Sequence, residues 1–432
     1  MNYKIQSNLP RKKSNMLSRE HNERIARTGP GTALGKAVRR YWVPAMLAMD
    51  LPQPGGDPVR VTLFNEDFVV FRTGDGTLGM LDEYCRHRSA SLMLGRVEDC
   101  GIRCIYHGWK FAADGTVLET PNVGGSSFRQ HFKANAYPIR EAGGLAWVYL
   151  GPVESQPPFP HWPWFDRPPS HTLLTCHYVQ CNFVQVLEGL VDSAHLNILH
   201  GNALGASSKS GLVYAQKVSA MVFDKAPAIE VQPTRFGFRY AAIRKIGGVD
   251  TARVTSFVAP FTVVNPNGDV VTIVVPSRDD LTLFFHVFWD EAQAMGEEPT
   301  RGQHLRFIGL DSESLGRVGL SKPDNPLAPG VHNHFYQDRE AMQRHDSFSG
   351  LPSLIAEDAI VSVASGCLRD RSTEMLSVSD LAVGQLYKTL LAVAAAGEAG
   401  TQPPGAAVDP RSDGTRGFSI DDLNGVNWRE LN

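Results

Sequence analysis

Two short motifs near residue 100 bring together residue types that imply redox chemistry. Cys85 and His87 form a C-x-H pair, and Cys104 and His107 form a C-x2-H pair after sixteen intervening residues. Two thiolates on one iron and two imidazoles on the other are the ligand set of a Rieske-type [2Fe–2S] cluster. Neutral imidazole leaves less negative charge on the cluster than thiolate does, so we expect a reduction potential above that of an all-cysteine cluster. The motifs therefore predict one-electron chemistry.

A structural zinc site is the alternative interpretation of the same four residues, because zinc accepts both cysteine and histidine. Zinc loops usually separate their ligands by two to four residues, whereas the first pair is separated by one. Each pair is also followed by small or flat residues, Ser89-Ala90 and Gly108-Trp109. Glycine allows close approach of backbone to a sulfide, and tryptophan can shield a cluster from water. We therefore favour the iron–sulfur interpretation.

A second group of ligand-type residues lies on a predicted helix. Glu188, Asp192 and His195 are spaced i, i+4 and i+7 and so share one helix face. His200 lies about 140° further round an ideal helix, so the helix must loosen or end between the two histidines, and Gly201 can supply the stop. Two imidazoles then lack one carboxylate of a 2-His-1-carboxylate triad, which suits non-haem Fe(II) and leaves positions open for O2.

Taken alone, this spacing is also compatible with two histidines that bind no metal and simply lie on the surface or in the core. A cluster that transfers single electrons needs an electron acceptor, however, so each motif supports the metal-binding interpretation of the other. Asp192 can accept the outer N–H of an iron-ligating histidine, or contact His87 or His107 of a cluster that approaches.

The third iron ligand must come from further along the chain, where the candidates are Asp346, Glu357, Asp358 and Glu374. Apolar residues surround Glu357 and Asp358 on a predicted helix, so one of the two should face inward. An unpaired inward carboxylate would be costly, and a metal would pair it. The spacing alone does not choose between Glu357 and Asp358.

Turn and strand patterns divide the 432 residues into four parts. Residues 1–41 look like a helical arm, and residues 42–155 look like a small all-β domain because short strands alternate with Asn/Asp/Gly turns. A proline-rich boundary opens a larger α+β region at 156–396, in which successive strand-like runs predict an antiparallel sheet. Residues 397–432 are interpreted as an extended tail.

Composition and charge exclude several function classes. The chain is 42% hydrophobic and 20% charged with a net charge of −3, which indicates no nucleic-acid affinity. No apolar run is long enough to span a bilayer. The N-terminus lacks the apolar core of a signal peptide, and the six cysteines suggest no disulfide framework, so we expect a cytoplasmic protein.

The N-terminus is unusually basic. Residues 1–40 contain ten Lys/Arg and two Asp/Glu, whereas the remainder contains 32 and 43. We favour a solvated arm. The alternative is an arm that docks on an acidic neighbouring subunit or on an electron donor.

Taken together, these motifs resemble those of the Rieske non-haem iron ring-hydroxylating oxygenases. More narrowly, the chain is similar to α subunits of the phthalate dioxygenase-like group from about Gly29 to about Leu391. The matching runs are Cys85-x-His87, Cys104-x2-His107-Gly108-Trp109, Asn182, Leu187-Glu188-Gly189, Asp192-Ser193-x-His195, His200, Ala356-Glu357-Asp358, Ser365-Gly366, Asp370-Arg371-Ser372 and Ser379-Asp380. Arg86 and Ile105 depart from the pattern where prolines are common, and Ser89 where glycine is common.

The resemblance implies an α+β fold with a small all-β Rieske domain and a larger catalytic domain built on a helix-grip antiparallel sheet. By the same resemblance Asp358 is the third iron ligand and Asn182 lies near the iron. Subunits should form a head-to-tail homotrimer, or two stacked trimers (α3 or α3α3). In either assembly Asp192 bridges the cluster of one subunit and the iron of the next. Electrons should come from NAD(P)H through a separate flavin and iron–sulfur reductase.

The expected reaction is insertion of O2 into an aromatic carboxylate of the phthalate, isophthalate or halobenzoate type, giving a cis-dihydrodiol. A monooxygenase or O-demethylase on the same scaffold is the nearest alternative. An electron-transfer Rieske protein without oxygenase activity is the alternative of another class.

An aromatic carboxylate needs an apolar slot with a cation at one end. In the strand-like run 236–244, alternate residues share one face, and Arg244 lies on the face of Phe236, Phe238 and Tyr240. Arg244 is therefore the predicted carboxylate clamp, with a structural ion pair as the alternative. Lys209 is a weaker candidate.

Overall fold

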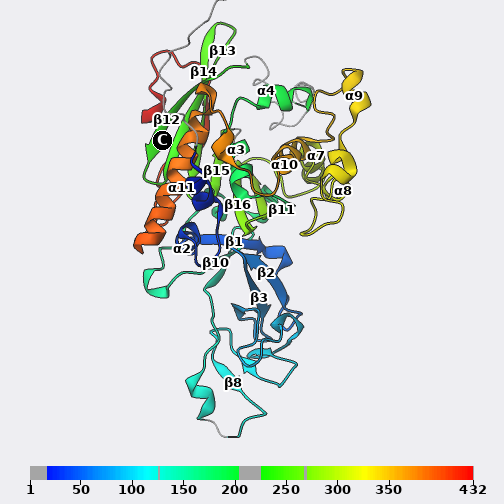
Figure 1. The fold of residues 1–432 in the computed structure, drawn as a ribbon, viewed down its shortest axis with the longest axis vertical. Coiled ribbons are helices and arrows are strands. Elements are labelled where there is room, and N and C mark those ends of the chain that lie inside the picture. The colour runs from blue at the N-terminus through cyan, green and yellow to red at the C-terminus, as the bar shows by residue number, and fades with distance from the viewer. Residues whose placement is uncertain (1–16, 125–126, 204–224, 267–269, 432) are drawn as a thin grey trace, which may run out of the picture.

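The computed structural model describes residues 17–124, 127–203, 225–266 and 270–431. In it, two domains follow one another along the long axis of the molecule, and two short helices, α1 (Arg19–Ala26) and α2 (Ala33–Val38), precede them (Figure 1). Residues 1–16 of the basic segment discussed above lie outside the described residues, as does Lys209. Among the helices that the structure describes, none is long and apolar enough to cross a membrane.

Short antiparallel hairpins form the N-terminal domain. The turn between its second and third strands consists of Phe64 and Asn65, whose φ angles of 53° and 64° match a two-residue turn that follows the strand twist. Three sheets result. Their strand orders are β1 (Trp42–Leu47), β10 (Leu145–Tyr149), β9 (Ile139–Ala142); then β2 (Val59–Leu63), β3 (Glu66–Arg72), β4 (Leu78–Asp82); then β5 (Arg96–Glu98), β6 (Gly101–Arg103), β7 (Lys110–Phe111), β8 (Val117–Glu119).

One antiparallel sheet of eight strands dominates the C-terminal domain, which confirms the predicted fold class. Its strands are rich in Val, Ile and Phe, and β16 and β17 are buried along almost their whole length, so the sheet is covered on both faces. The order is β11 (Thr172–Val179), β17 (Leu281–Trp289), β16 (Val270–Arg278), β15 (Thr262–Asn265), β14 (Val249–Val258), β13 (Gly237–Ile246), β12 (Ala228–Thr234), with β18 (Phe418–Ile420) paired to β14.

The longest helix, α11 (Leu381–Ala399), packs against β12 and β13 and against α2 (Figure 1). A Cβ atom at Gly397 would lie 2.2 Å from the carbonyl oxygen of Ala33, so only glycine allows this approach. The remaining helices gather at the other end of the sheet: α3 (Phe183–Val191), α4 (Leu196–Leu199), α7 (Thr300–Ile308), α8 (Ser312–Arg317), α9 (Arg339–Gln343) and α10 (Leu354–Ala364).

The C-terminal tail is packed rather than free. Residues 397–399 still belong to α11, and β18 adds to the edge of the sheet through β14. Trp428 is buried with Ala252 and Val254, which explains why the segment does not extend into solvent.

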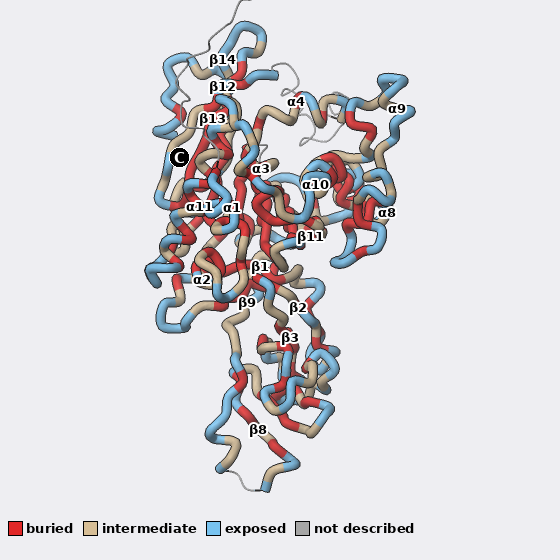
Figure 2. The backbone as a smooth tube through the Cα atoms, viewed as in Figure 1, coloured by how far each residue is buried: buried red, intermediate tan, exposed pale blue. Residues whose placement is uncertain are grey.

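Most of the buried apolar residues belong to two hydrophobic cores. The larger core is continuous across both domains, and Phe64 of the N-terminal domain stacks on Phe261 of the sheet at 5.9 Å between centroids. The smaller core lies inside the N-terminal domain and includes Cys85, Cys104 and Trp109. The two cores meet at β3, where Phe68 and Val70 belong to the larger core and Val69 and Phe71 to the smaller one, and Figure 2 shows buried chain in both domains. The two Cys/His loops are thus supported by a core of their own.

Candidate active site

The two Cys/His loops have the same backbone design. In the first, the amide of Cys85 donates to Ala90 O at 2.9 Å and the amide of Ser89 donates to Cys85 O at 2.9 Å. In the second, the amide of Cys104 donates to Trp109 O at 2.8 Å and the amide of Gly108 donates to Cys104 O at 3.0 Å. Ser89 and Gly108 therefore occupy equivalent positions, and both have positive φ, 54° and 74°. Serine adopts at some energetic cost a conformation that is free to glycine.

The four side chains at these loops fit an iron–sulfur cluster. Cys85 and Cys104 are free thiols that are almost fully buried, and burial together with the neighbouring thiol raises the pKa of Cys85 to about 11. The rings of His87 and His107 lie 4.5 Å apart, and His107 Nδ1 is buried without a hydrogen-bond partner among the described residues. Trp109 stacks on His87 at 4.7 Å and shields one side. Buried thiols beside an unpartnered imidazole nitrogen are costly unless a metal centre binds them.

The second metal site depends on a break in the helix. α3 ends at Val191, and the amide of Asp192 donates to the carbonyl of Glu188 at 3.0 Å as the C-cap. A separate turn, α4, then lies between His195 and His200. α4 ends at Leu199 and His200 is its non-helical C-cap, so the helix does end between the two histidines as predicted, and the break between α3 and His195 is an additional one that was not predicted. Gly201 is not the stop, because residues 201–203 are again helical.

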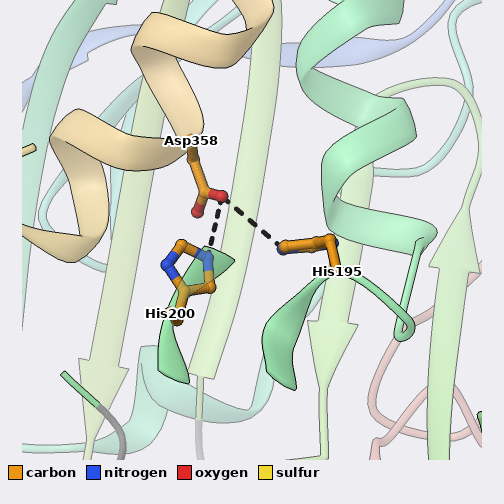
Figure 3. Close-up of side chains that lie close together, drawn as sticks. All are labelled: His195, His200 and Asp358. Atoms are coloured by element: carbon orange, nitrogen blue, oxygen red, sulfur yellow. Dashed lines mark hydrogen bonds and ion pairs between the residues drawn. The ribbon is translucent and has the colours of Figure 1, made fainter. Parts of the chain in front are cut away.

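This break lets both histidines face a carboxylate on α10. Asp358 Oδ1 lies 3.0 Å from His200 Nε2 and 3.6 Å from His195 Nε2 (Figure 3). One ligand atom from each residue lies within 4.8 Å of the others. Two imidazoles and one carboxylate converging in this way are the donor set that suits non-haem Fe(II). Of the four candidate carboxylates, the structure brings Asp358 together with the two histidines, and not Glu357, Asp346 or Glu374.

Each histidine has a second carboxylate behind it. His200 Nδ1 donates to Glu357 Oε2 at 2.7 Å, and His195 Nδ1 donates to Asp192 Oδ2 at 3.3 Å. These bonds fix the tautomer that presents Nε2 to a metal. Burial lowers the pKa of His200, but Asp358 and Glu357 outweigh it and raise the value to about 10. The local field thus strongly favours a cation.

Glu188 is placed away from this donor set. Its carboxylate is buried and accepts hydrogen bonds from Arg369, Arg371 and, at 2.6 Å, the hydroxyl of Tyr387. Arg371 also donates to Asn22 of α1 at 3.0 Å. Glu188, which would share a face with Asp192 in an ideal helix, therefore anchors α3.

Asn182 does not lie near the iron site, which corrects the expectation from the family resemblance. It is the N-cap of α3, accepts from the amide of Val184 at 3.2 Å, and donates to Ala26 O and Asp279 O. The nine residues of α3 separate it from Asp192 by about 13 Å. Its role is to fix the start of the helix that ends at the metal site.

A cavity of about 140 Å³ opens on the three metal donors. Residues of the sheet line its floor, and residues of α10 and of the end of α3 line its other walls. Apolar and polar residues alternate along the floor; those used below are Tyr240, Arg253, Thr272, Phe284, His286 and Phe288.

Arg244 is not among the residues that line this cavity. It is buried, and its Nη2 donates to the carbonyl oxygen of Ser193 at 2.7 Å and to Ser193 Oγ at 3.1 Å. It thus supports the segment between Asp192 and His195. Arg253, on the neighbouring strand β14, lines the cavity, and the sequence argument missed it because that argument was applied only to the run 236–244.

Fold and sites together define a two-domain redox enzyme with a [2Fe–2S] site in one domain and a ferrous site in the other. Residues 41–136 match the model of the Rieske [2Fe-2S] domain, and residues 148–431 match the LigXa C-terminal domain-like family. The oxygenase subunit of phthalate 4,5-dioxygenase from Pseudomonas putida is 36% identical over 426 residues, which cover 96% of this chain and 94% of that one.

Two further comparisons agree. The oxygenase subunit of 3-chlorobenzoate-3,4-dioxygenase from Comamonas testosteroni is 31% identical and covers 90% of this chain and 92% of its own. The crystal structure of dicamba monooxygenase bound to dicamba has the same fold, with a TM-score of 0.56 at 17% identity over 84% of this chain and 99% of that one.

The chain belongs to the Rieske non-haem iron ring-hydroxylating oxygenases. It is the terminal oxygenase component, an oxidoreductase that incorporates O2, and its cofactors are a [2Fe–2S] cluster and a non-haem iron that receive electrons from a separate reductase. The predictions of family, fold class, enzyme class and cofactors are thereby confirmed.

Proposed function

We propose that the enzyme is a dioxygenase of aromatic carboxylates of the phthalate, isophthalate or halobenzoate type and forms a cis-dihydrodiol. The observation that carries this proposal is the cavity at the iron site, in which Phe284, Phe288 and Ile355 provide apolar walls and Arg253 provides a cation. The two relatives described above are named for phthalate and for 3-chlorobenzoate, both aromatic carboxylates.

The residues of this chain have separable tasks in that reaction. Cys85, His87, Cys104 and His107 would hold the cluster, and His195, His200 and Asp358 would hold the iron. When bound, the cluster supplies single electrons and the ferrous ion supplies O2 activation. Glu357 and Asp192 keep the iron-facing imidazoles in the Nε2-presenting tautomer.

The cavity walls bind and orient the ring. A guanidinium can bind a carboxylate through two parallel hydrogen bonds, which fixes the direction of the ring as well as its position. The aromatic walls exclude water from the apolar edge of the ring, where oxygen is to be inserted.

Product analysis tests the proposal. The purified enzyme is supplied with NADH, a generic Rieske-oxygenase reductase and a panel of benzoates under 18O2. A dioxygenase delivers two labelled oxygen atoms into one dihydrodiol. A product with a single labelled oxygen, or loss of an O-methyl group, would establish the monooxygenase or O-demethylase alternative instead.

Two arginines can be separated by the same assay. Arg253→Gln should raise KM for a benzoate far more than KM for an uncharged arene, because the cavity loses its carboxylate partner. Arg244→Gln should instead lower turnover of both substrates, because Arg244 supports Ser193 beside the iron ligands. A benzoate-specific KM effect at Arg244 and none at Arg253 would restore Arg244 as the clamp.

We also propose a head-to-tail homotrimer, either single or stacked. Figure 1 shows the N-terminal domain projecting from the catalytic domain, with β8 far from α3, α4 and α10. The cluster loops carry exposed apolar side chains, with Leu94, Ile105 and Tyr106 exposed to 64%, 63% and 53%. Such a patch beside a redox centre is suited to docking on a neighbouring subunit, with Asp192 at the receiving iron site. Light scattering measures the mass of the assembly in solution, which should be three or six times that of the 47.4 kDa chain.

The reductase would be a flavin and iron–sulfur protein that uses NAD(P)H, and the compartment would be the cytoplasm. All six cysteines lie in the described residues and are free thiols, which is compatible with a reducing compartment. Fractionation of the native cells with an antibody against this chain tests the location.

A further inference from the structure

His286 is an unusual residue on the floor of the cavity. It lies on β17 between Phe284 and Phe288, is only 5% exposed, and lines the cavity with both of them. Its Nε2 atom is buried and has no hydrogen-bond partner among the described residues. Burial, together with His177 behind it, holds the pKa of His286 well below its ordinary value, so the ring is neutral. A neutral buried nitrogen without a partner costs free energy unless something else binds it.

The ring of His286 is held in one orientation. It lies 4.2 Å from the ring of Phe284, 5.2 Å from that of His177 with an interplanar angle of 17°, and 6.1 Å from that of Phe288 with an angle of 7°. Aromatic rings on both sides leave little room for rotation, so the nitrogen keeps its direction when a ligand arrives.

The ring of His177, which lies behind His286, borders a small space of its own. Both nitrogens of His177 also lack partners among the described residues. A separate space of about 20 Å³, lined by His177, Asp358 and Ser362, has room for about one water molecule. His286 does not line that space but lines the larger cavity. Of these two spaces His286 borders only the substrate cavity, so the contents of that cavity are the candidate partner of its ring.

Sheet register places His286 and Arg253 at opposite corners of the floor. Thr272 of β16 pairs with His286, and the same register continues to Phe257 of β14, which is three strands beyond β17 in the order β17-β16-β15-β14. Arg253 lies four residues along β14 from Phe257, so three strand spacings and four residues together put the two backbones about 20 Å apart on a diagonal of the sheet. A ring whose carboxylate reaches Arg253 therefore presents its far edge, not its neighbouring positions, to His286.

We propose that His286 is a substrate-binding residue that hydrogen-bonds a neutral oxygen substituent, above all a hydroxyl group, on the ring edge remote from the carboxylate. This inference rests on the aromatic-acid function proposed above. A hydroxyl group both donates and accepts, so it matches either tautomer of a neutral imidazole. The preferred substrate class is thus a meta- or para-oxygenated aromatic acid.

Four ligands test the carboxylate contact with Arg253 and the hydroxyl contact with His286 independently: 4-hydroxybenzoate, 4-methylbenzoate, 4-methylphenol and 1,4-dimethylbenzene. Each is titrated anaerobically into the fully iron-loaded enzyme without reductase, and the dissociation constant is measured by calorimetry. The wild type should bind each hydroxyl compound roughly three- to tenfold more tightly than its methyl partner. In His286→Phe that ratio should fall to about one, and His286→Gln, which keeps a hydrogen-bonding group, should retain part of it.

His304→Phe is the matched control. His304 is another buried histidine, packed 4.6 Å from Phe288, but it does not line the cavity, so its substitution should leave the hydroxyl-to-methyl ratio unchanged. A wild-type ratio near one, or an unchanged ratio in His286→Phe, would overturn the inference. If the aromatic-acid proposal fails, each acid will bind no more tightly than the uncharged compound that lacks its carboxylate. In that case 4-methylphenol and 1,4-dimethylbenzene still test the hydroxyl contact of His286.

Discussion

At the scale of single residues, the carboxylates at the iron site have different roles. Asp358 faces both histidines, whereas Glu357, its neighbour on α10, reaches the far side of His200 and is itself fixed by the hydroxyl of Ser349. Adjacent residues on a helix point about 100° apart, which allows one to bind the metal and the other to orient a ligand. The two acidic side chains are therefore not interchangeable.

The iron content of variants should distinguish the role of Asp358 from that of Glu357. Asp358→Asn should reduce iron from three atoms to two per chain while the visible absorption of the cluster persists, because a donor is lost. Glu357→Gln should keep the iron but weaken its affinity roughly 10- to 100-fold, measured by competition with a chelator. Asp346→Asn, whose carboxylate pairs with Arg344 at 2.7 Å on the surface, serves as the unaffected control. Equal losses in all three variants would refute the assignment.

Asp192 should be needed for electron transfer rather than for metal binding. Asp192→Asn should retain both metals, because its side chain contacts the outer nitrogen of His195 and the amide of Ala194 rather than a metal-facing atom, yet product formation should be abolished. Stopped-flow reduction of the cluster by the reductase should stay normal while reoxidation in the presence of substrate and O2 stops. Full turnover by this variant would contradict the proposed bridge.

Residue type and spacing were enough to identify the candidate cluster residues and the two candidate iron-binding histidines, because thiolates and imidazoles in short repeats have few other uses. The sequence could not separate Glu357 from Asp358, since both lie on one apolar helix and the choice depends on where α10 sits relative to α4. Arg253 was missed for a related reason: alternation along a strand identifies a face, but only the packed sheet shows which part of that face is open.

At the scale of elements, the end of α3 is held by a buried ionic cluster. Glu188 bonds to Arg369, Arg371 and Tyr387, and thereby connects α3 to α11 and, through Asn22, to α1. The side chains of Glu188 and Arg371 are almost fully buried, so each charge depends on the other. This cluster fixes the point at which α3 stops and the metal-binding segment begins.

Breaking that cluster should destabilise the catalytic domain. Glu188→Gln leaves the buried guanidinium of Arg371 without its counter-charge, and the loss should be about 3–5 kcal/mol in the free energy of unfolding. Glu374→Gln removes the outer partner of Arg369, where both side chains are about one-quarter exposed, and should cost less than about 1 kcal/mol. Denaturant unfolding followed by tryptophan fluorescence measures both. A cost of Glu188→Gln no larger than that of Glu374→Gln would show that the cluster is not structural.

Elements with strong local patterns were predictable, and breaks between elements were not. The long β-branched and aromatic runs gave the antiparallel sheet, whereas the stop of α3 before His195 is set by tertiary contacts of Glu188 and Arg244 that no local pattern contains. The C-terminal segment looked free because it is rich in glycine and proline, yet Trp428 packs on Ala252 and Val254 together with Phe418, Ile420 and Leu423, and β18 pairs with β14.

At the scale of the whole molecule, one chain separates its two redox centres into two domains that share a core. The N-terminal domain is joined to the sheet by Phe64 and by the bond from its amide to Pro276 O at 3.0 Å, so it is a fixed projection rather than a loosely tethered unit. Its cluster end carries apolar side chains that a solitary chain leaves in water.

Charging that end should disrupt assembly without harming the cluster. Ile105→Asp should lower the mass seen by light scattering towards that of the single chain and slow turnover at least tenfold, because a desolvated charge opposes docking. The visible spectrum of the cluster should not change. Val153→Asp, at a similarly exposed apolar residue away from the cluster loops, should leave mass and rate unaltered. An unchanged mass in Ile105→Asp would remove this patch from the interface.

The account depends most directly on one polypeptide binding two kinds of iron centre. Metal and acid-labile sulfide analysis of the purified protein, with electron paramagnetic resonance of its reduced form, measures this in one preparation. We expect three iron atoms and two sulfides per chain and the spectrum of a mixed-ligand [2Fe–2S] cluster. A colourless protein with zinc bound by Cys85, His87, Cys104 and His107 and no labile sulfide would contradict it.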